Sequence, residues 1–439
     1  MPARTLSGLL LPSGDPAAPA GARLVNDTTC DVLIVGAGPA GLSAARRLKR
    51  LGVERVVVID REREAGGVPR HCFHTGFGIR DLRRLMSGPR YAAALTRRAR
   101  RTGVIIRTEC TATTWRTEGD ARSVEITSPE GRQSIRARAI LLATGCRERP
   151  RAARMVPGAR PGGVYTTGAL QQCVYLMSQK PGTRAIVVGA EHVSYSAVLT
   201  LAHAEVTTAA IVTGHAGTQT FAAAHWWVAG RRRIPLIANA SVTRILGRDR
   251  VTGLEIETDG TRREIECDCI VFTGDWIPDH ELCRAGDIPL DSRTHGPAVD
   301  ASLRTLTPGV FAAGNVLRGA EPADVASLEG RHVADAIVRM LAGRSSWADS
   351  EAAGPIEVEA PIAWISPNRA ARDAGNLPGG RFAFRVEEFL GPGRIVLDQN
   401  GRLLVERRFR KLIPNRWYAL KGEPGVTAQH ALRMRFEPG

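Results

Sequence analysis

This chain of 439 residues has few lysines, few aromatic residues and no long apolar run. Only four of its 60 basic residues are lysines, and aromatic residues make up 5% of the chain. The net charge of +16 invites a nucleic-acid partner, but no nucleic-acid-binding motif accompanies it and stacking aromatics are scarce. We therefore expect no nucleic acid among the partners. No run of about 18 apolar residues occurs, so we expect no transmembrane segment.

Cysteine pairs are also missing. The eight cysteines contain no CxxC pair, and none follows Cys283. This pattern excludes a CxxC redox dithiol and a C-terminal iron–sulfur module, which needs about four clustered cysteines. The apolar cluster Leu9 to Leu11 is too short for a secretory signal. We expect a cytoplasmic protein with reduced thiols, and a disordered lead-in over residues 1–29, which are rich in Pro, Ala and Gly.

The stretch from Cys30 to Asp60 carries the strongest pattern in the chain. The apolar run Asp31 to Val35 predicts a buried strand, and Gly36, Gly38 and Gly41 follow it in GxGxxG spacing. The first glycine allows a tight turn, the second admits a pyrophosphate, and the third lets the next helix pack closely on the strand. The free N–H groups and the dipole of that helix would face the phosphates.

An acid at the end of the second strand completes this pattern. Residues Arg55 to Ile59 predict the strand, and Asp60 lies 19 residues after Gly41. A carboxylate at an offset of about 20 residues can hydrogen-bond an adenosine ribose. The alternative is an ordinary glycine turn in a βαβ unit, since the chain has 46 glycines. The strand, the helix and the acid together favour a dinucleotide site.

A glycine-rich loop over residues 61–81 follows the acid, and we expect no regular structure in it. Gly66 and Gly67 can fold back on the same pyrophosphate, and loops of this length are usually functional. His71 and His74 are candidate catalytic residues facing a flavin or substrate, because histidine exchanges protons near neutral pH. The alternative is that both are hydrogen-bonded loop residues. We expect no metal site, because no third ligand is nearby.

A similar but imperfect pattern recurs after a Pro- and Gly-rich crossover over residues 147–180. Ala185 to Val188 predicts a strand that ends at Gly189, but Glu191 stands where the second glycine is needed. Its carboxylate would set charge and bulk against a pyrophosphate. The next predicted strand, Thr207 to Val212, has no acid at its end. This lobe is expected to have the shape of a nicotinamide site without its chemistry.

The remaining runs complete two lobes and add a third region. Gln133 to Arg138 ends a predicted β-meander, and Ala139 to Cys146 predicts a separate apolar strand. Ala323 to Leu341 has helical periodicity. From residue 344 onward, short runs separated by Gly and Pro predict a small antiparallel β domain, which we interpret as a partner- or self-association module.

Together these patterns predict an α/β fold with two Rossmann-like dinucleotide-binding domains, the second inserted in the first, and a small C-terminal β domain. The predicted domains are a dinucleotide-binding domain over residues 30–148 and 290–343, an inserted NAD(P)-binding-like domain over residues 149–289, and the C-terminal domain over residues 344–439.

In this order the pieces resemble the two-dinucleotide-binding-domain flavoproteins, over residues 30 to 341. The resemblance rests on GAGPAG at Gly36 to Gly41 with Asp60, ATG at Ala143 to Gly145, TGD at Thr273 to Asp275 and TPGVFAAGN at Thr307 to Asn315. It implies that the first lobe holds FAD and that the last motif meets the flavin ribityl and pyrophosphate. The family usually has Asp where this chain has Asn315, a change that keeps an acceptor and loses a charge.

The residues expected to bind FAD are Gly36, Gly38, Pro39, Ala40, Gly41, Asp60, Arg61, Gly66, Gly67, Val68, Ala112, Thr144, Gly145, Gly314 and Asn315.

Three stretches, Gly66 to Arg84, Ala143 to Pro150 and Gly162 to Gln171, look most like a narrower group of this family. These are the FAD subunits of opine oxidases, hydroxyproline and sarcosine-type dehydrogenases, and bacterial hydrogen cyanide synthase. The resemblance implies oxidation of a C–H bond next to an amine nitrogen, often inside a hetero-complex. Many such subunits carry a C-terminal cysteine-rich iron–sulfur domain, where this chain has a cysteine-free region, so the route by which electrons leave is open.

The leading hypothesis is an FAD-dependent oxidoreductase that passes hydride from an amine, an amino acid or an opine to flavin. Its expected partners are that small molecule and an electron-accepting subunit. One alternative is an NAD(P)H-dependent flavin reductase that uses the inserted lobe, against which Glu191 argues. The other is a flavin-binding, non-catalytic subunit of a hetero-complex.

Overall fold

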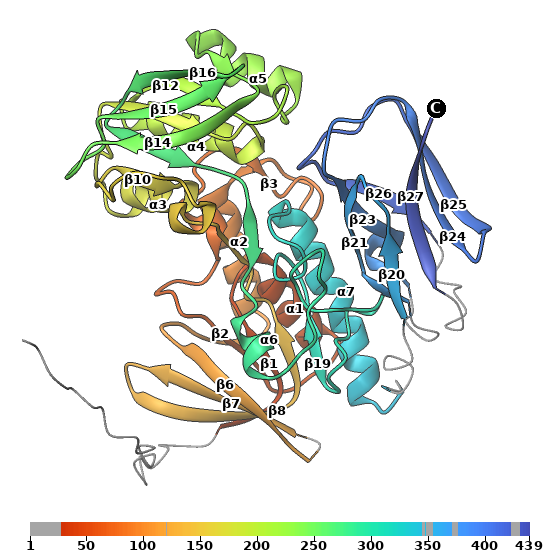
Figure 1. Ribbon diagram of the computed structural model, residues 1–439. Coiled ribbons are helices and arrows are strands. Elements are labelled where there is room, and N and C mark those ends of the chain that lie inside the picture. The colour runs from red at the N-terminus through yellow and green to blue at the C-terminus, as the bar shows by residue number, and fades with distance from the viewer. Residues whose placement is uncertain (1–27, 120, 345–346, 348–353, 371–375, 423–430) are drawn as a thin grey trace, which may run out of the picture.

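The chain is described from a computed structural model, which is shown in Figure 1. The structure describes residues 28–119, 121–344, 347, 354–370, 376–422 and 431–439. Residues 1–27 of the predicted lead-in lie outside the described residues, whereas Thr28 and Thr29 already belong to the first strand. Within the described part of the chain, no helix is both long and apolar enough to cross a membrane.

Seven strands form the sheet of the first lobe: β1 (Thr28–Val35), β2 (Val56–Ile59), β5 (Ile105–Arg107), β6 (Thr111–Glu118), β7 (Ala121–Ser128), β8 (Gly131–Leu142) and β19 (Val310–Ala312). Their order is β5-β2-β1-β8-β7-β6, and β19 pairs with β8. The strands β5, β2, β1, β8 and β19 run parallel, while β7 and β6 extend the sheet antiparallel. Val, Ile and Leu dominate the central strands because both faces of a parallel sheet are covered.

Strand β8 combines two segments that the sequence predicted separately. One strand spans Gly131–Leu142, so the expected break between residues 138 and 139 is wrong. No Gly or Pro follows Gly131 within this run, and the backbone therefore continues as one strand. Its first half pairs antiparallel with β7, and its last residues pair parallel with both β1 and β19.

Helices α1 (Pro39–Arg50) and α7 (Ala323–Leu341) pack against each other beside this sheet, as Figure 1 shows. A Cβ at Gly330 would overlap the carbonyl oxygen of Ala40, so only glycine permits this close approach of the two backbones. The bounds of α7 are those that the periodicity predicted. Two further helices complete the lobe, α2 (Gly88–Arg100) and the short α6 (Glu281–Ala285).

The loop over residues 61–81 contains short regular elements that we did not expect. A 3-10 helix spans Val68–His71, and β3 (Thr75–Phe77) pairs with β4 (Met86–Ser87). Proline at the second position of the 3-10 helix restricts φ to helical values and favours this turn. Farther along, Arg80 donates to the buried carboxylate of Asp324 in the first turn of α7, at 3.1 Å from the guanidinium and 3.0 Å from the backbone N–H.

The second lobe has its own five-stranded parallel sheet, in the order β10-β17-β11-β12-β13. Its strands are β10 (Val164–Thr166), β11 (Arg184–Val188), β12 (Thr207–Val212), β13 (Leu236–Ile237) and β17 (Cys269–Phe272). Its helices are α3 (Thr167–Gln171), which continues as a π-helix over Gln172–Leu176, α4 (His192–His203) and α5 (Ala222–Val228).

An antiparallel meander lies on the second lobe, and a short ribbon joins this lobe to the first. The meander consists of β14 (Ala240–Leu246), β15 (Gly253–Thr258) and β16 (Thr261–Glu266). The ribbon pairs β9 (Cys146–Glu148), where the chain leaves the first lobe, with β18 (Trp276–Pro278), where it returns. The second lobe is thus inserted between β8 and β19 of the first.

The C-terminal region forms two small β sheets around a separate apolar core. One sheet has the order β22-β20-β27-β24-β25 and the other β21-β23-β26. Their strands are β20 (Gly354–Val358), β21 (Ile362–Ser366), β22 (Arg369–Ala370), β23 (Arg381–Val386), β24 (Gly393–Gln399), β25 (Arg402–Phe409), β26 (Tyr418–Lys421) and β27 (Leu432–Pro438). The predicted fold class, two Rossmann-like lobes and a C-terminal β domain, is therefore confirmed.

The C-terminal β domain contacts both lobes. On the first lobe, Arg385 pairs with the buried carboxylate of Glu321 at 2.8 Å. On the second, the guanidinium of Arg416 donates to the carbonyl oxygen of Gln219 at 2.8 Å and to that of Thr220. It also lies 4.6 Å from the ring centroid of Phe221. The domain therefore links the two lobes through arginine side chains.

Candidate functional site

The carboxyl ends of four neighbouring parallel strands meet at one edge of the first-lobe sheet. The strands β2, β1, β8 and β19 end at Ile59, Val35, Leu142 and Ala312. Open parallel sheets bind ligands in the crevice outside these ends. The fold thereby brings together four groups predicted from distant parts of the chain, Gly36 to Gly41, Asp60, Thr144 with Gly145, and Gly314 with Asn315.

The glycines after β1 have three different surroundings. Gly36 adopts a φ of 111°, and a Cβ there would overlap the carbonyl group of Ala143. A Cβ at Gly41 would overlap the carbonyl oxygen of Gly36, so the helix packs directly on the turn. At Gly38, in contrast, a Cβ would meet no atom within 4 Å, so this backbone is open to the crevice. Such an opening fits the close approach of a pyrophosphate.

The N-terminus of α1 provides free donors beside this opening. The helix begins at Pro39, its N-cap residue Gly38 has no side chain to cap it, and its first turn holds no acidic residue. Its first N–H groups are therefore available to phosphate oxygens, and the helix dipole favours a negative charge there. Ala40 follows in the same turn and packs against the loop that returns after β19.

The carboxylate of Asp60 stabilises the glycine turn. One oxygen accepts the N–H of Ala37 at 2.6 Å, and the other accepts the N–H of Glu62 at 2.9 Å. Burial raises the pKa of Asp60, while these two hydrogen bonds oppose the rise. Each oxygen has a second acceptor direction, so the carboxylate can also accept a ribose hydroxyl. The N–H of Cys110 donates to the carbonyl oxygen of Asp60 at 2.9 Å, and Ala112 follows two residues later in the chain.

The loop after Asp60 folds back over the same turn. The N–H of Gly66 donates to the carbonyl oxygen of Ala37 at 2.8 Å. Gly67 has a φ of 64°, and a Cβ there would lie 2.9 Å from the Cα of Gly38. Val68 follows with an exposed side chain. The Arg61 guanidinium forms a salt bridge of 3.2 Å with Asp279.

The chain returns to the crevice after β19. Gly314 adopts a φ of 81°, its N–H donates to Glu329 at 3.0 Å, and a Cβ there would lie 2.8 Å from the Cβ of Ala40. The side-chain oxygen of Asn315 accepts the N–H of Glu321 at 3.2 Å, which leaves its amide N–H groups as donors. The last predicted motif therefore lies against the N-terminus of α1.

The turn after β8 is tied to the segment that returns from the second lobe. The hydroxyl of Thr144 donates to the carbonyl oxygen of Asp279 at 2.7 Å. The N–H of Asp279 donates in turn to the carbonyl oxygen of Gly145 at 2.9 Å. Burial raises the pKa of the Asp279 carboxyl to about 6, and the Arg61 guanidinium opposes the rise.

His71 is buried where the first lobe meets the second. Its Nδ1 lies 3.2 Å from the side-chain oxygen of Gln171, and the Cys72 thiol donates to the same oxygen at 3.3 Å. The amide nitrogen of Gln171 donates to Ser196 at 2.9 Å. Because a carbonyl oxygen only accepts, Nδ1 carries the proton and Nε2 is left as the acceptor. Burial lowers the pKa of His71, so the imidazole is neutral near pH 7.

His74 has the same protonation pattern in a half-buried position. Its Nδ1 donates to the carbonyl oxygen of Thr75 at 2.9 Å, so Nε2 again keeps a free lone pair. Burial lowers the pKa of His74, and its ring centroid lies 5.2 Å from that of Phe77. Both predicted histidines are hydrogen-bonded through Nδ1, and in both the hydrogen bond leaves a neutral base.

Two residues of this region were not predicted as site residues, Glu148 and Gln171. The Glu148 carboxylate accepts the N–H groups of Thr167 at 2.9 Å and Gly168 at 2.7 Å, at the start of α3. Burial raises the pKa of Glu148. Because α3 ends at Gln171, this contact orients the amide that binds His71. The sequence signal was weak: an acid a few residues after the ATG turn and a glutamine in an expected crossover.

The thiols near the site are neutral. All eight cysteines are free, and burial raises the pKa values of Cys72 and Cys146 to about 12. A neutral thiol is a poor nucleophile. Across the described residues, no three His, Cys, Asp or Glu side chains are grouped so that they could hold a metal ion.

The second lobe differs at the equivalent turn. Glu191 is the N-cap residue of α4 but makes no capping hydrogen bond with its side chain, and its buried carboxylate lies beside the hydroxyls of Thr273 and Ser194. The carboxylate lies between the glycine turn and the end of β17, since a Cβ at Gly189 would come within 2.8 Å of it and one at Gly274 within 3.1 Å. Burial raises its pKa. The side chain thus fills the position that is open at Gly38.

A loop also covers this turn from outside. The N–H of Gln219 donates to the carbonyl oxygen of Ala190 at 2.9 Å, and the hydroxyl of Thr218 contacts the same oxygen at 3.3 Å. Arg416 of the C-terminal β domain binds this loop from its other side. Protein groups therefore occupy the crevice of the second lobe on both sides of the turn.

Comparison with known proteins assigns the chain to a family. Residues 30–330 match the family model of the pyridine nucleotide-disulphide oxidoreductases, which is more than half of the chain. The chain belongs to this family of FAD-dependent oxidoreductases, and FAD is its cofactor, as predicted. The open backbone at Gly38, the free N-terminus of α1 and the acceptor at Asp60 fit that cofactor.

Similar sequences include subunits of opine oxidase and sarcosine oxidase. The A subunit of opine oxidase from Rhizobium meliloti is 26% identical over 324 residues, which are 67% of this chain and 60% of that protein. The alpha subunit of sarcosine oxidase from Corynebacterium sp. strain P-1 is 27% identical over 334 residues, 71% of this chain and 32% of that protein. The chain thus spans less than two thirds of the length of these relatives.

Solved structures share the fold. Thioredoxin reductase of T. acidophilum aligns with a TM-score of 0.60 at 23% identity and covers 74% of this chain and 99% of its own. L-proline dehydrogenase from P. horikoshii aligns with a TM-score of 0.55 at 18% identity, over 74% of this chain and 59% of its own. These likenesses confirm the two-lobed architecture of the family.

Proposed function

We propose that this FAD-dependent oxidoreductase oxidises a C–H bond adjacent to an amine nitrogen, in an amino acid, an opine or a related small molecule. The observation that carries the proposal is the pair of neutral histidines on the loop attached to the FAD crevice. The names of the similar proteins, which are subunits of opine oxidase and sarcosine oxidase, support the same substrate class.

The FAD-binding residues are proposed from the crevice described above. The N–H groups at Gly38, Ala40, Gly41 and Gly67 would surround the pyrophosphate, and Asp60 would accept a ribose hydroxyl. Gly314 and Asn315 would lie along the ribityl chain. Thr144 and Gly145 hold the turn beside it. When bound, FAD supplies the acceptor for a hydride.

The histidines suit an amine because its nitrogen is protonated near neutral pH. An ammonium group has no lone pair to assist the loss of a hydride from the neighbouring carbon, so one proton has to leave first. His71 and His74 both present a neutral Nε2 that can accept it. Gln171 keeps His71 in the required tautomer, and Glu148 positions Gln171 through α3. We assign the proton transfer to this pair.

The electrons are proposed to leave through a partner subunit. The filled turn at Glu191 argues against NAD(P)H at the second lobe, and therefore against the flavin reductase alternative. The buried thiols with raised pKa values argue against a disulfide substrate. Relatives that are named as subunits agree with a separate electron-accepting partner.

Anaerobic reduction of the purified FAD-bound chain tests this proposal. We expect at least one compound in a panel of amino acids, opines and N-methyl amino acids to bleach the flavin absorbance, and NADH or NADPH to leave it unchanged. Bleaching by NADPH and by no amine would make the protein a flavin reductase. Reduction by dithionite, with neither an amine nor a nicotinamide able to bleach the flavin, would make it a non-catalytic component of a hetero-complex.

A further inference from the structure

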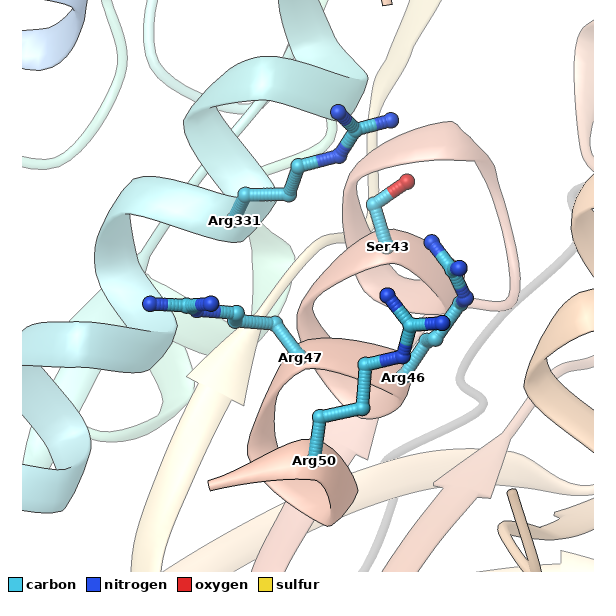
Figure 2. Close-up of a pocket in the computed structure, with 5 residues that line it drawn as sticks. All are labelled: Ser43, Arg46, Arg47, Arg50 and Arg331. Carbon is cyan, nitrogen blue, oxygen red and sulfur yellow. The ribbon is translucent and has the colours of Figure 1, made fainter. Parts of the chain in front are cut away.

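A cavity lined by arginines lies on the outer side of the first lobe. Its lining consists of Ser43, Arg46, Arg47 and Arg50 from α1 and Arg331 from α7, and it encloses about 170 Å³. In Figure 2, Arg46 and Arg50 extend side by side from α1, and Arg331 reaches over from α7. The arginines of α1 belong to its later turns, away from the Gly38 end that faces the FAD crevice.

The cations in this cavity exceed the available carboxylates. Arg47 pairs with Asp335 at 2.9 Å, and Arg331 approaches Asp81 at 3.7 Å. Arg46 and Arg50 form no salt bridge with any carboxylate among the described residues. The remaining lining residue, Ser43, is neutral, and its hydroxyl is hydrogen-bonded to that of Ser327 at 2.7 Å.

The neighbouring arginines repel the positive charge of Arg46. The pKa of Arg46 is lowered by burial first and then by the neighbouring cations Arg50, Arg98 and Arg331. Arg98 comes from α2, so three helices contribute positive charge to one place. Like charges held together without counter-charges destabilise a folded chain, and a bound anion would remove that repulsion.

We propose that this cavity binds a small phosphate-type oxyanion. A guanidinium presents its N–H groups as a planar fork that matches two oxygens of a phosphate, and several forks around one cavity can bind a dianion from different sides. Arg46 and Arg50 supply the unpaired forks, and Arg331 closes the site from α7. The site is separate from the FAD crevice and assigns a second anion-binding function to α1.

Occupancy of this cavity connects to the FAD crevice through the helices that line it. An anion held by both α1 and α7 bridges two helices whose N-terminal turns flank the crevice, at Pro39 and at Ala323. The two helices that the anion would join are also in tight contact with each other at Gly330 and Ala40. Bound phosphate therefore stabilises the pair of helices and raises the thermal midpoint of the FAD-bound protein.

Calorimetric titration of the full FAD-bound chain with sodium phosphate, at constant ionic strength set with NaCl, tests the site. FAD fills the phosphate cradle at Gly38, so that cradle cannot account for the binding. We expect one saturable site per chain. The variant R46Q/R50Q should weaken binding at least tenfold, whereas the matched control R97Q/R100Q removes two arginines from the last turn of α2 and should change it less than twofold.

Retention of bound FAD verifies that each variant is folded, and R46K/R50K separates charge from geometry. Lysine keeps the charge without the fork, so we expect intermediate affinity. A parallel titration with AMP distinguishes the two sources of the phosphate group. AMP that binds more tightly than phosphate would identify a phosphomonoester as the ligand, and AMP that binds no more tightly would identify free phosphate. Phosphate heat that does not saturate, or an equal loss in R46Q/R50Q and R97Q/R100Q, would overturn the proposal. Binding of an oligonucleotide without binding of phosphate or AMP would overturn it too.

Discussion

The two lobes of this protein begin with similar turns, which differ in chemistry at the position of Gly38 and Glu191. After β1 the turn passes through Gly38, whose backbone is open to the crevice, and the N-terminus of α1 has no negative group beside it. After β11 the turn passes through Glu191, whose carboxylate occupies the N-terminus of α4. The helix dipole that attracts a phosphate in the first lobe is met by the protein's own carboxylate in the second. The second lobe therefore keeps a Rossmann-like shape, in which a carboxylate fills the position that is open in the first lobe.

A glutamate placed in the first-lobe turn should have the largest effect on cofactor binding. In Gly38→Glu the first lobe acquires the side chain of the second, and the new carboxylate occupies the position proposed for the pyrophosphate. We expect the protein to lose FAD, with affinity reduced at least a thousandfold, or about 4 kcal/mol. The flavin absorbance of the purified protein measures this. Gly391→Glu, at an exposed glycine with equally open surroundings, should keep its flavin. Yellow Gly38→Glu protein would contradict the assignment.

The contact between the lobes at His71 should give the next largest effect. His71→Asn removes the neutral base, and we expect kcat/KM for the amine substrate to fall by about 10² to 10³. Since burial lowers the pKa of His71, the neutral form persists below the usual value of 6.5. The acid limb of the wild-type pH profile should therefore lie below pH 6.5 and disappear in the variant. His295→Asn, at an exposed histidine of the segment before β19, is the control. An unchanged profile in His71→Asn would transfer the role to His74 or to another base.

A smaller effect is expected at the acid that supports the first-lobe turn. In the wild type each carboxylate oxygen of Asp60 accepts one N–H, at 2.6 Å and 2.9 Å. Asp60→Asn keeps only one acceptor oxygen and therefore loses one of these two hydrogen bonds. We expect FAD to bind about tenfold more weakly, or about 1.4 kcal/mol. Fluorescence titration of the apoprotein with FAD measures the change. Asp31→Asn, in the same strand unit but on its exposed side, should leave the affinity unchanged. Equal affinity in Asp60→Asn would show that the carboxylate supports neither the turn nor the ribose.

The smallest effect concerns the closed turn of the second lobe. The pKa of Glu191 is raised in the folded protein, so the folded state binds its proton more tightly than the unfolded state. Its contribution to the free energy of unfolding therefore falls as pH rises from the usual pKa of 4.5 through the raised value. Glu191→Gln should become more stable relative to wild type across this window, by about 1.4 kcal/mol for each unit of the shift. Urea unfolding of the FAD-bound protein at several pH values measures this, with Glu264→Gln, at an exposed glutamate of β16, as the control. A flat difference for Glu191→Gln would show that its carboxylate is not desolvated.

The sequence predicted the elements whose signals are local. The glycine turn, the acid at Asp60, the strand Thr207–Val212 and the helix Ala323–Leu341 follow from spacing and periodicity, and the structure has them at or near the predicted bounds. The helix of the second lobe begins at His192, directly after Glu191. Local patterns set these elements because their causes lie within a few residues.

The supporting contacts of the site could not be predicted in this way. Gln171 meets His71 across a separation of 100 residues, and Glu148 orients it through the N-terminus of α3. The loop at Gln219 reaches the turn of the second lobe and is itself bound by Arg416, 197 residues away. Such contacts depend on how the lobes and the C-terminal β domain pack, and no periodicity records that packing. The arginine cavity is another case, since it needs α1 and α7 side by side.

The late return of the chain at β19 has a consequence for biosynthesis. The first lobe begins at β1, yet its sheet receives β19 and its crevice receives Gly314 only after the whole second lobe has been made. During synthesis the growing chain can form the second lobe as a local unit while the edge of β8 that pairs with β19 waits for its neighbour. FAD uptake then becomes a late event, in which the cofactor joins a lobe that was started before the second lobe and finished after it.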